Sequence, residues 1–187
     1  MMDLKLETDF GNDLKRINFI YKNNPIVTKC IKGFDGFSLL GHRIGPFKKG
    51  KRYKMKQFIA TPFIKRGILE VIPEEKCDNM DVQRLAIKER DDQRIVNQKD
   101  KFLLNKIREF RQFLVKKVNE NVIPQTNLNR YNSYLSNLVD SRLLKLLKLS
   151  RSELSPADEK NLTDAEKLLN KNIFKLINSW RKFFLDL

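Results

Sequence analysis

Glycine does not occur after Gly67 in this 187-residue chain. All seven glycines lie between Gly11 and Gly67. Because glycine permits the backbone angles that tight turns need, the chain is expected to reverse direction often before Gly67 and seldom after it. The sequence therefore predicts an α+β protein, with a small β-rich domain over residues 1–75 and an all-α helical bundle over residues 76–187.

Short apolar runs between turn residues predict strands in the first domain. The helical spacing of apolar residues between the last two runs predicts a short helix that starts near Phe58 and ends at Gly67, with Pro62 shortening or kinking it. Acidic residues around Pro73 then mark a linker. The predicted strands are residues 17–21, 26–31, 53–55 and 68–72.

Apolar residues three and four apart predict helices beyond residue 79. One helix is expected over about 99–119, and the next is expected to begin with Thr126 or Asn127 as its N-cap, because Pro124 ends the previous segment. Ser155 followed by proline, and the capping box Thr163–Glu166, predict two further helix starts. The expected core stripes are Ile107, Phe110, Phe113, Leu114 and Val118 in the first helix, and Leu128, Tyr131, Leu135, Leu138 and Val139 in the second.

The last two long helices carry more apolar residues than one buried stripe requires. Leucines at 143, 144, 146, 147 and 149 surround more than half of one helix, so a second face of that helix must also be covered. These residues are either the core of a helical bundle or part of a subunit interface, for which Trp and Phe are favoured anchors. The candidate interface residues are Leu143, Leu146, Leu147, Phe174, Ile177, Trp180, Phe183 and Phe184.

Residues that usually carry catalysis or bind metals are sparse. The chain has one histidine, His42, in a glycine-rich turn, and its adjacent carboxylates do not converge on a helix face. Cys30 and Cys77 are far apart in the sequence, with no second Cys or His at metal spacing. We therefore expect reduced structural thiols, no enzymatic activity, no cofactor and no metal.

The chain is basic, with 38 Lys and Arg against 23 Asp and Glu, for a net charge of +15. Residues 1–75 hold 15 bases and 8 acids, and residues 76–187 hold 23 and 15, so the charge is divided almost evenly. One stretch, 43–56, has no acid and includes Phe47 and Tyr53. Bases interleaved with aromatics are typical of a single-strand nucleic-acid groove, but a solvated hairpin turn is an equal alternative. The candidate docking residues, for a partner or DNA, are Arg43, Lys48, Lys49, Lys51 and Arg52.

The N-terminus has no apolar segment of signal-peptide length, and no run of about 20 apolar residues would cross a membrane. We therefore expect a soluble cytoplasmic protein.

A turn with Gly-Pro-Phe, a polar glycine hairpin, a strand and a short helix with an alanine follow one another over residues 41–70. This order resembles the small β domain of GINS subunits, components of the replicative helicase assembly in archaea and eukaryotes. The chain departs from the family at Met55-Lys56, where proline often stands, and at Phe58, where tryptophan often stands. The matching residues, all with structural roles, are Gly45, Pro46, Phe47, Gly50, Phe58, Ala60 and Gly67.

The resemblance implies a function without catalysis. With the β domain first, the chain is similar to the archaeal class that corresponds to the eukaryotic partner-of-Sld-five two and three subunits. Members assemble through their helical domains, in archaea commonly as a 2:2 heterotetramer with a second GINS subunit type, and bind the MCM helicase and a RecJ-like protein. The alternative is an independent basic DNA-binding protein that uses the 43–56 segment.

Overall fold

The computed structural model describes residues 3–39 and 41–185, in which helices are combined with small antiparallel sheets. This combination confirms the predicted α+β class. In chain order the elements are α1 (Asp3–Lys22), β1 (Pro25–Cys30), β2 (Phe37–Leu39), β3 (His42–Ile44), β4 (Arg52–Lys56), α2 (Gln57–Lys65), β5 (Leu69–Val71), the 3-10 turn η1 (Pro73–Glu75), α3 (Asn79–Asp91), α4 (Leu103–Asn119), α5 (Gln125–Leu149), α6 (Pro156–Glu159) and α7 (Asp164–Leu185).

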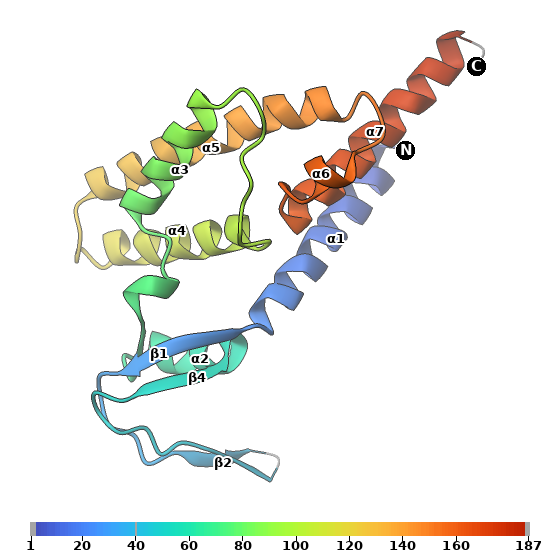
Figure 1. Ribbon diagram of the computed structural model, residues 1–187. Helices are drawn as coiled ribbons and strands as arrows, with labels where there is room; N and C mark the ends of the chain where they lie inside the picture. Colours follow the sequence, from blue (N-terminus) through green and yellow to red (C-terminus); the bar gives the residue numbers. More distant parts are fainter. Residues whose placement is uncertain (1–2, 40, 186–187) are drawn as a thin grey trace. The chain divides into compact units, whose positions relative to one another are not determined.

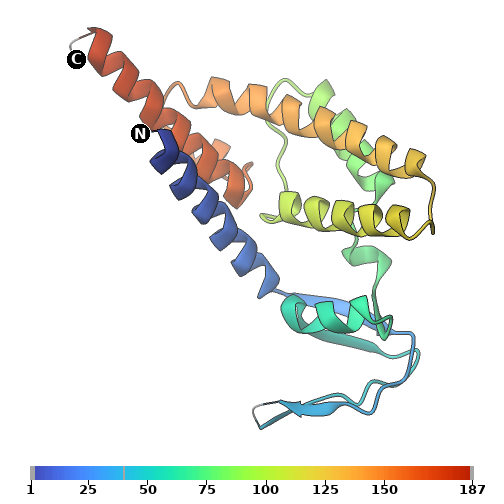
Figure 2. The same ribbon diagram turned by 180° about the vertical axis from the view of Figure 1, so that it is seen from behind.

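The chain divides into two compact units, whose elements are drawn in Figures 1 and 2. The small unit is Lys15–Lys76, and the helical unit combines the residues up to Leu14 with those from Cys77 onward. The predicted boundary after residue 75 is therefore close to the structural one. The segment that ends at Leu14, however, was assigned to the β-rich domain and belongs to the helical unit, so α1 runs through both units.

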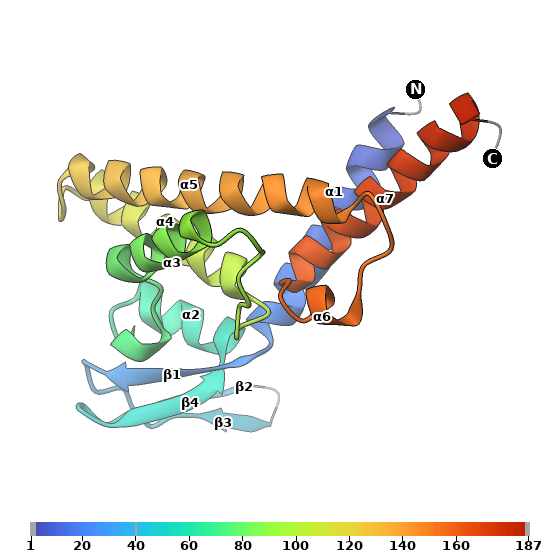
Figure 3. The same ribbon diagram turned by 45° about the horizontal axis from the view of Figure 1, so that its top comes forward.

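The small unit is built on a three-stranded antiparallel sheet in the order β4-β1-β5. Lys29 of the central strand is paired in register with Arg52 of β4 and with Glu70 of β5. Side chains alternate between the two faces of a strand, so Thr28 and Cys30 point to the buried face while Lys29 points to solvent. Helix α2 packs on the buried face (Figure 3). The predicted strands at 26–31, 53–55 and 68–72 are confirmed as β1, β4 and β5.

Aromatic rings fill the space between the sheet and α2. The Phe47 ring lies 5.0 Å from the rings of Tyr53 and Phe63, edge to face in both pairs. Ala60 of α2 is fully buried, whereas Phe58, at the start of that helix, is 50% exposed and does not contribute to this core. The buried members of the core are Cys30, Phe47, Phe63, Ile68 and Leu69.

Two glycines allow the segments flanking the β2–β3 hairpin to touch. A Cβ atom on Gly45 would lie 2.7 Å from the Cα atom of Gly36, closer than real Cβ atoms approach. Gly36 and Gly45 also have positive φ angles, 87° and 95°, which side chains disfavour. The Gly45–Pro46 bond is cis, and Gly50 provides a further positive φ in the turn before β4. Gly36, Gly45 and Gly50 therefore determine the path of the backbone in the small unit.

Helix α2 ends as predicted at Gly67. The Ile68 N–H donates to the Phe63 carbonyl at 2.9 Å and the Gly67 N–H to the Ile64 carbonyl at 3.1 Å, which is the Schellman arrangement. Gly67 has a φ of 68°, which glycine adopts without strain. Pro62 lies inside the helix.

The predicted strand at 17–21 is wrong, because these residues are the last turns of α1. Tyr21 is buried, and Phe10, Leu14 and Ile17 are half-buried at spacings of four and three that continue to Tyr21. A short apolar run without its upstream context does not distinguish a strand from a helix. The hairpin strands β2 and β3 were not among the predicted strands.

Helices α3, α4 and α5 enclose the core of the helical unit. Tyr131 is fully buried, and its hydroxyl lies 3.1 Å from the carbonyl oxygens of Cys77 and Ile107. Of the residues predicted as stripes, Phe113 and Val139 are instead about 40% exposed. The buried members of this core are Cys77, Val82, Ala86, Leu103, Ile107, Leu114, Leu128, Tyr131 and Leu138.

The predicted helix starts are partly right. The Ser155 side chain caps α6, and the Thr163–Glu166 capping box forms at the start of α7. Helix α5 begins directly after Pro124, which replaces the expected Thr126 or Asn127 as N-cap and makes no side-chain cap bond. Proline at this position already holds the extended backbone that precedes a helix.

Three charged side chains are buried in the helical unit, Glu89 of α3, Arg142 of α5 and Glu166 of α7, and the half-buried Lys145 of α5 joins them. Arg142 binds Glu166 through Nε at 2.5 Å and Nη2 at 2.8 Å, and binds Glu89 through Nη1 at 2.6 Å. Its two remaining N–H groups donate to the carbonyls of Val96 and Asn161, so all five guanidinium donors are used. We call these four residues the ion cluster.

The other members of the ion cluster are equally saturated. The Lys145 ammonium donates to the Glu89 carboxylate at 2.7 Å and to the carbonyls of Glu89 and Arg94. Glu166 also accepts the N–H and hydroxyl of Thr163, each at 2.8 Å, so one carboxylate serves both the ion cluster and the cap of α7. Two positive and two negative charges cancel within the cluster, which limits the cost of burying them.

Burial lowers the pKa of the Arg142 guanidinium, but the hydrogen bond and charge of Glu166, together with those of Glu89, outweigh it and raise that pKa overall. These contacts therefore favour the charged form of Arg142.

Replacing Arg142 with methionine should strongly destabilise the chain. Two carboxylates would remain buried without their main counterion, and such losses cost about 3–5 kcal/mol in the free energy of unfolding. Urea denaturation followed by circular dichroism measures the change. Arg130→Met, an exposed position on the same helix, should change the same quantity by less than about 0.5 kcal/mol. Equal effects of the two variants would contradict the structural role of the ion cluster.

Burial raises the pKa of the Cys77 thiol from 9.0 to about 12, with the charge of Asp81 adding to the effect. Well below pH 9 the thiol is neutral in both the folded and the unfolded chain. As the pH rises past 9, the thiol ionises in the unfolded chain but stays neutral in the folded one. The free energy of unfolding should therefore fall by roughly 1 kcal/mol between pH 8 and pH 10. Urea denaturation at both pH values, compared with Cys77→Ser, isolates this contribution. A wild-type decrease no larger than that of the variant would contradict it.

Candidate interaction surfaces

Helix α7 is buried only near its start. Glu166 and Asn170 are buried, and Asn170 donates to the Ser150 hydroxyl at 2.8 Å, which anchors the first turns against the end of α5. The later turns extend beyond the end of α5 (Figures 1 and 3). We call the exposed apolar residues of these turns the α7 face: Leu176, Trp180, Phe183, Phe184 and Leu185.

The α7 face is strongly apolar and well exposed. Trp180, Phe183 and Phe184 are 63%, 78% and 62% exposed, and the ring of Phe184 lies 5.0 Å from both others. Burying one such side chain stabilises a protein or a complex by about 1.5–3 kcal/mol. Because the cluster is exposed, this chain does not gain that stabilisation by itself. Between residues 167 and 185 the helix carries five bases and no acid.

Helix α5 has a second exposed apolar strip, which we call the α5 face: Leu143, Leu144 and Leu147, with exposed fractions of 37–64%. Leu146 was predicted to belong to the interface, and this is wrong. Its side chain is 2% exposed and packs with Ile95 and Leu162 in the interior of the helical unit. Phe174 and Ile177 are half-buried.

The predicted docking residues Arg43, Lys48, Lys49, Lys51 and Arg52 are all exposed. Lys48 to Lys51 form a tight turn, closed by the Lys51 N–H bonding to the Lys48 carbonyl at 3.1 Å.

The two aromatic residues of the 43–56 stretch are not available as stacking platforms. Phe47 is 4% exposed in the core, and the half-buried Tyr53 packs against it while its hydroxyl accepts the Lys48 N–H at 2.7 Å. The interpretation of this stretch as a base-stacking groove is therefore wrong.

The structural boundaries also change the distribution of charge. Residues 15–76 hold 15 bases and 4 acids, a net charge of +11, whereas the remainder of the chain holds 23 and 19, a net charge of +4. The even division expected from the sequence arose because the four acids of the segment before Lys15 were counted with the β-rich domain. The small unit is therefore the basic part of the molecule.

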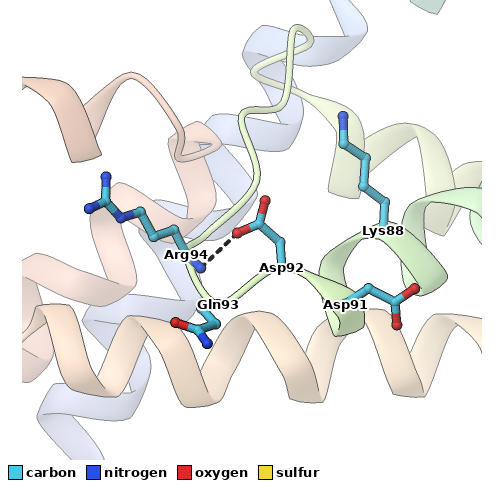
Figure 4. Close-up of a pocket in the computed structure, with 5 residues that line it drawn as sticks. All are labelled: Lys88, Asp91, Asp92, Gln93 and Arg94. Atoms are coloured by element: carbon cyan, nitrogen blue, oxygen red, sulfur yellow. Dashed lines mark hydrogen bonds between the residues drawn. The ribbon is translucent and has the colours of Figure 1, made fainter.

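One hollow on the surface, of about 630 Å³, is polar and widely open. Figure 4 shows its lining residues, Lys88, Asp91, Asp92, Gln93 and Arg94, with side chains that point in different directions. Asp92 accepts the backbone N–H of Arg94 at 2.9 Å, which makes it part of a turn. This arrangement brings no reactive groups together.

Among residues 3–39 and 41–185, no three His, Cys, Asp or Glu side chains gather as a metal site. Within the same ranges, no helix has the length and apolar character needed to cross a membrane. No protein-family model matches this chain, and no curated protein matches it either.

Proposed function

We propose that this chain is a non-catalytic subunit of a GINS-type assembly, in which the α7 face and the α5 face bind a neighbouring subunit. The observation that carries the proposal is the exposed aromatic cluster of Trp180, Phe183 and Phe184. Tryptophan and other aromatic residues are among the commonest anchors of protein interfaces, because they bury a large area with few rotatable bonds.

The attachment of α7 supports this role. The ion cluster and the Asn170–Ser150 bond fix the first turns of the helix, and Arg181 donates to the Arg151 carbonyl at 3.0 Å further along. A helix held in this way loses little freedom when a partner covers its exposed face, so more of the burial energy is available for binding.

The small unit precedes all of the helical unit except the segment that ends at Leu14, and this order supports the assignment to the β-domain-first class. In this proposal the partner is a second GINS subunit type in a 2:2 heterotetramer, and the assembled complex bridges the MCM helicase and a RecJ-like protein. The small unit then docks onto a helicase partner. This role would place the chain in the cytoplasm, associated with the chromosome.

Co-expression with the second subunit type, followed by native mass measurement, tests the proposal. The wild-type chain should give a discrete heterotetramer, and the triple variant Trp180→Ser, Phe183→Ser, Phe184→Ser should lose it. The matched control Phe58→Ser, Met80→Ser, Val122→Ser removes three side chains that are 50–60% exposed elsewhere, and it should retain the complex.

Two results would contradict the proposal. One is a wild-type chain that sediments as a well-behaved monomer and ignores the partner. The other is a triple variant that assembles as well as the control.

A further inference from the structure

The solvent-facing side of the sheet in the small unit carries a compact group of four bases. Lys29 of β1 lies directly opposite Arg52 of β4, and Lys54 and Lys56 follow Arg52 at alternate positions on the same strand. All four are exposed. We call these residues the basic face.

The charges of the basic face are mostly uncompensated. Glu70 lies opposite Lys29 on the other side, but its carboxylate is bound by Lys76 at 3.0 Å. Glu74 is 3.8 Å from Arg52, and both side chains are more than 60% exposed, so this ion pair is weak.

Protection of a sheet edge does not explain the whole group. Lysine on an edge strand discourages pairing with another sheet, and β4 is such a strand. Lys29, however, lies on the central strand β1, where there is no open edge. Like charges directly opposite each other also destabilise a sheet, so a base at this position lowers stability without a protective role.

We propose that the basic face binds the phosphate backbone of nucleic acid without regard to base sequence. A row of bases at alternate strand positions suits a polymer with regularly spaced negative charges. No aromatic residue belongs to the exposed side of these strands, because Tyr53 points to the core. Binding therefore depends on phosphate contacts and not on base stacking.

This inference keeps only Arg52, Lys54 and Lys56 of the 43–56 segment expected from the sequence. It adds Lys29, which is distant from Arg52 in the sequence and is brought beside it by the β1–β4 pairing. It is also independent of the proposed assembly role, because it concerns the small unit and no subunit contact.

Fluorescence anisotropy of labelled single-stranded and duplex DNA with the full-length chain tests the inference. The test variant changes Lys29, Arg52, Lys54 and Lys56 to Gln. The matched control changes four exposed bases of the helical unit, Lys88, Arg108, Arg130 and Lys171, to Gln and lowers the net charge equally.

The test variant should bind at least roughly tenfold more weakly at about 100 mM salt, and the slope of log affinity against log salt for duplex DNA should fall by roughly 3. The control should bind like the wild type, and binding should not depend on DNA sequence. Replacing the three lysines with Arg should preserve affinity, since the charge is retained, and circular dichroism verifies that each variant is folded.

Several results would overturn the inference: no DNA binding by the wild type at low salt, equal losses in the test and control variants, or unchanged binding in the folded test variant. Binding to vesicles containing anionic lipid but not to DNA would also overturn it and would identify a membrane surface as the ligand. Loss of DNA binding with an intact heterotetramer separates this inference from the proposed assembly role.

Discussion

The arrangement of the helical unit depends on one guanidinium group. Arg142 uses all five of its donors, binding carboxylates of α3 and α7 and carbonyls of the two loops before α4 and α7. Its position on α5 makes that helix the shared support of its neighbours. Since Glu166 is also the capping residue of α7, the same ion cluster that holds the helices together fixes where α7 begins and in which direction it runs. The position of the exposed aromatic rings further along α7 therefore depends on the ion cluster.

The two units differ in the kind of surface they present. The small unit is strongly basic and has an aromatic core. The bases of the basic face lie on the solvent-facing side of its short sheet. The helical unit is nearly balanced in charge, because most of its bases have acids among the same helices, and it exposes apolar side chains instead. Charge and apolar surface are suited to different ligands, so the two units are expected to bind different partners.

Local signals in the sequence were sufficient for much of the fold. The Schellman end at Gly67, the capping box at Thr163 and strands β1, β4 and β5 depend on residues close in sequence, and all were predicted. The helix over residues 17–21 was missed because its apolar run is short, and its period is visible only when Phe10 and Leu14 are included.

The features that could not be predicted depend on contacts between distant segments. Glu89 and Arg142 look like ordinary surface charges in helical sequence, and Glu166 is recognisable only as a capping residue; the packing of three helices buries all three. Lys29 gains its neighbour Arg52 through strand pairing, and Leu146 differs from Leu143 and Leu147 only in the direction its side chain takes from α5. One sequence signal was available: reading residues 3–13 as part of a helix would have separated their four acids from the basic unit.

Hydrogen–deuterium exchange of the full-length chain tests most directly whether the two units bind separate partners. Duplex DNA should slow exchange in peptides covering residues 25–30 and 52–56 and leave those covering residues 176–185 unchanged. The second subunit should slow exchange in residues 143–147 and 176–185 and leave the strands unchanged. Protection of the same peptides by both ligands, or of neither region by its expected ligand, would contradict this division of roles.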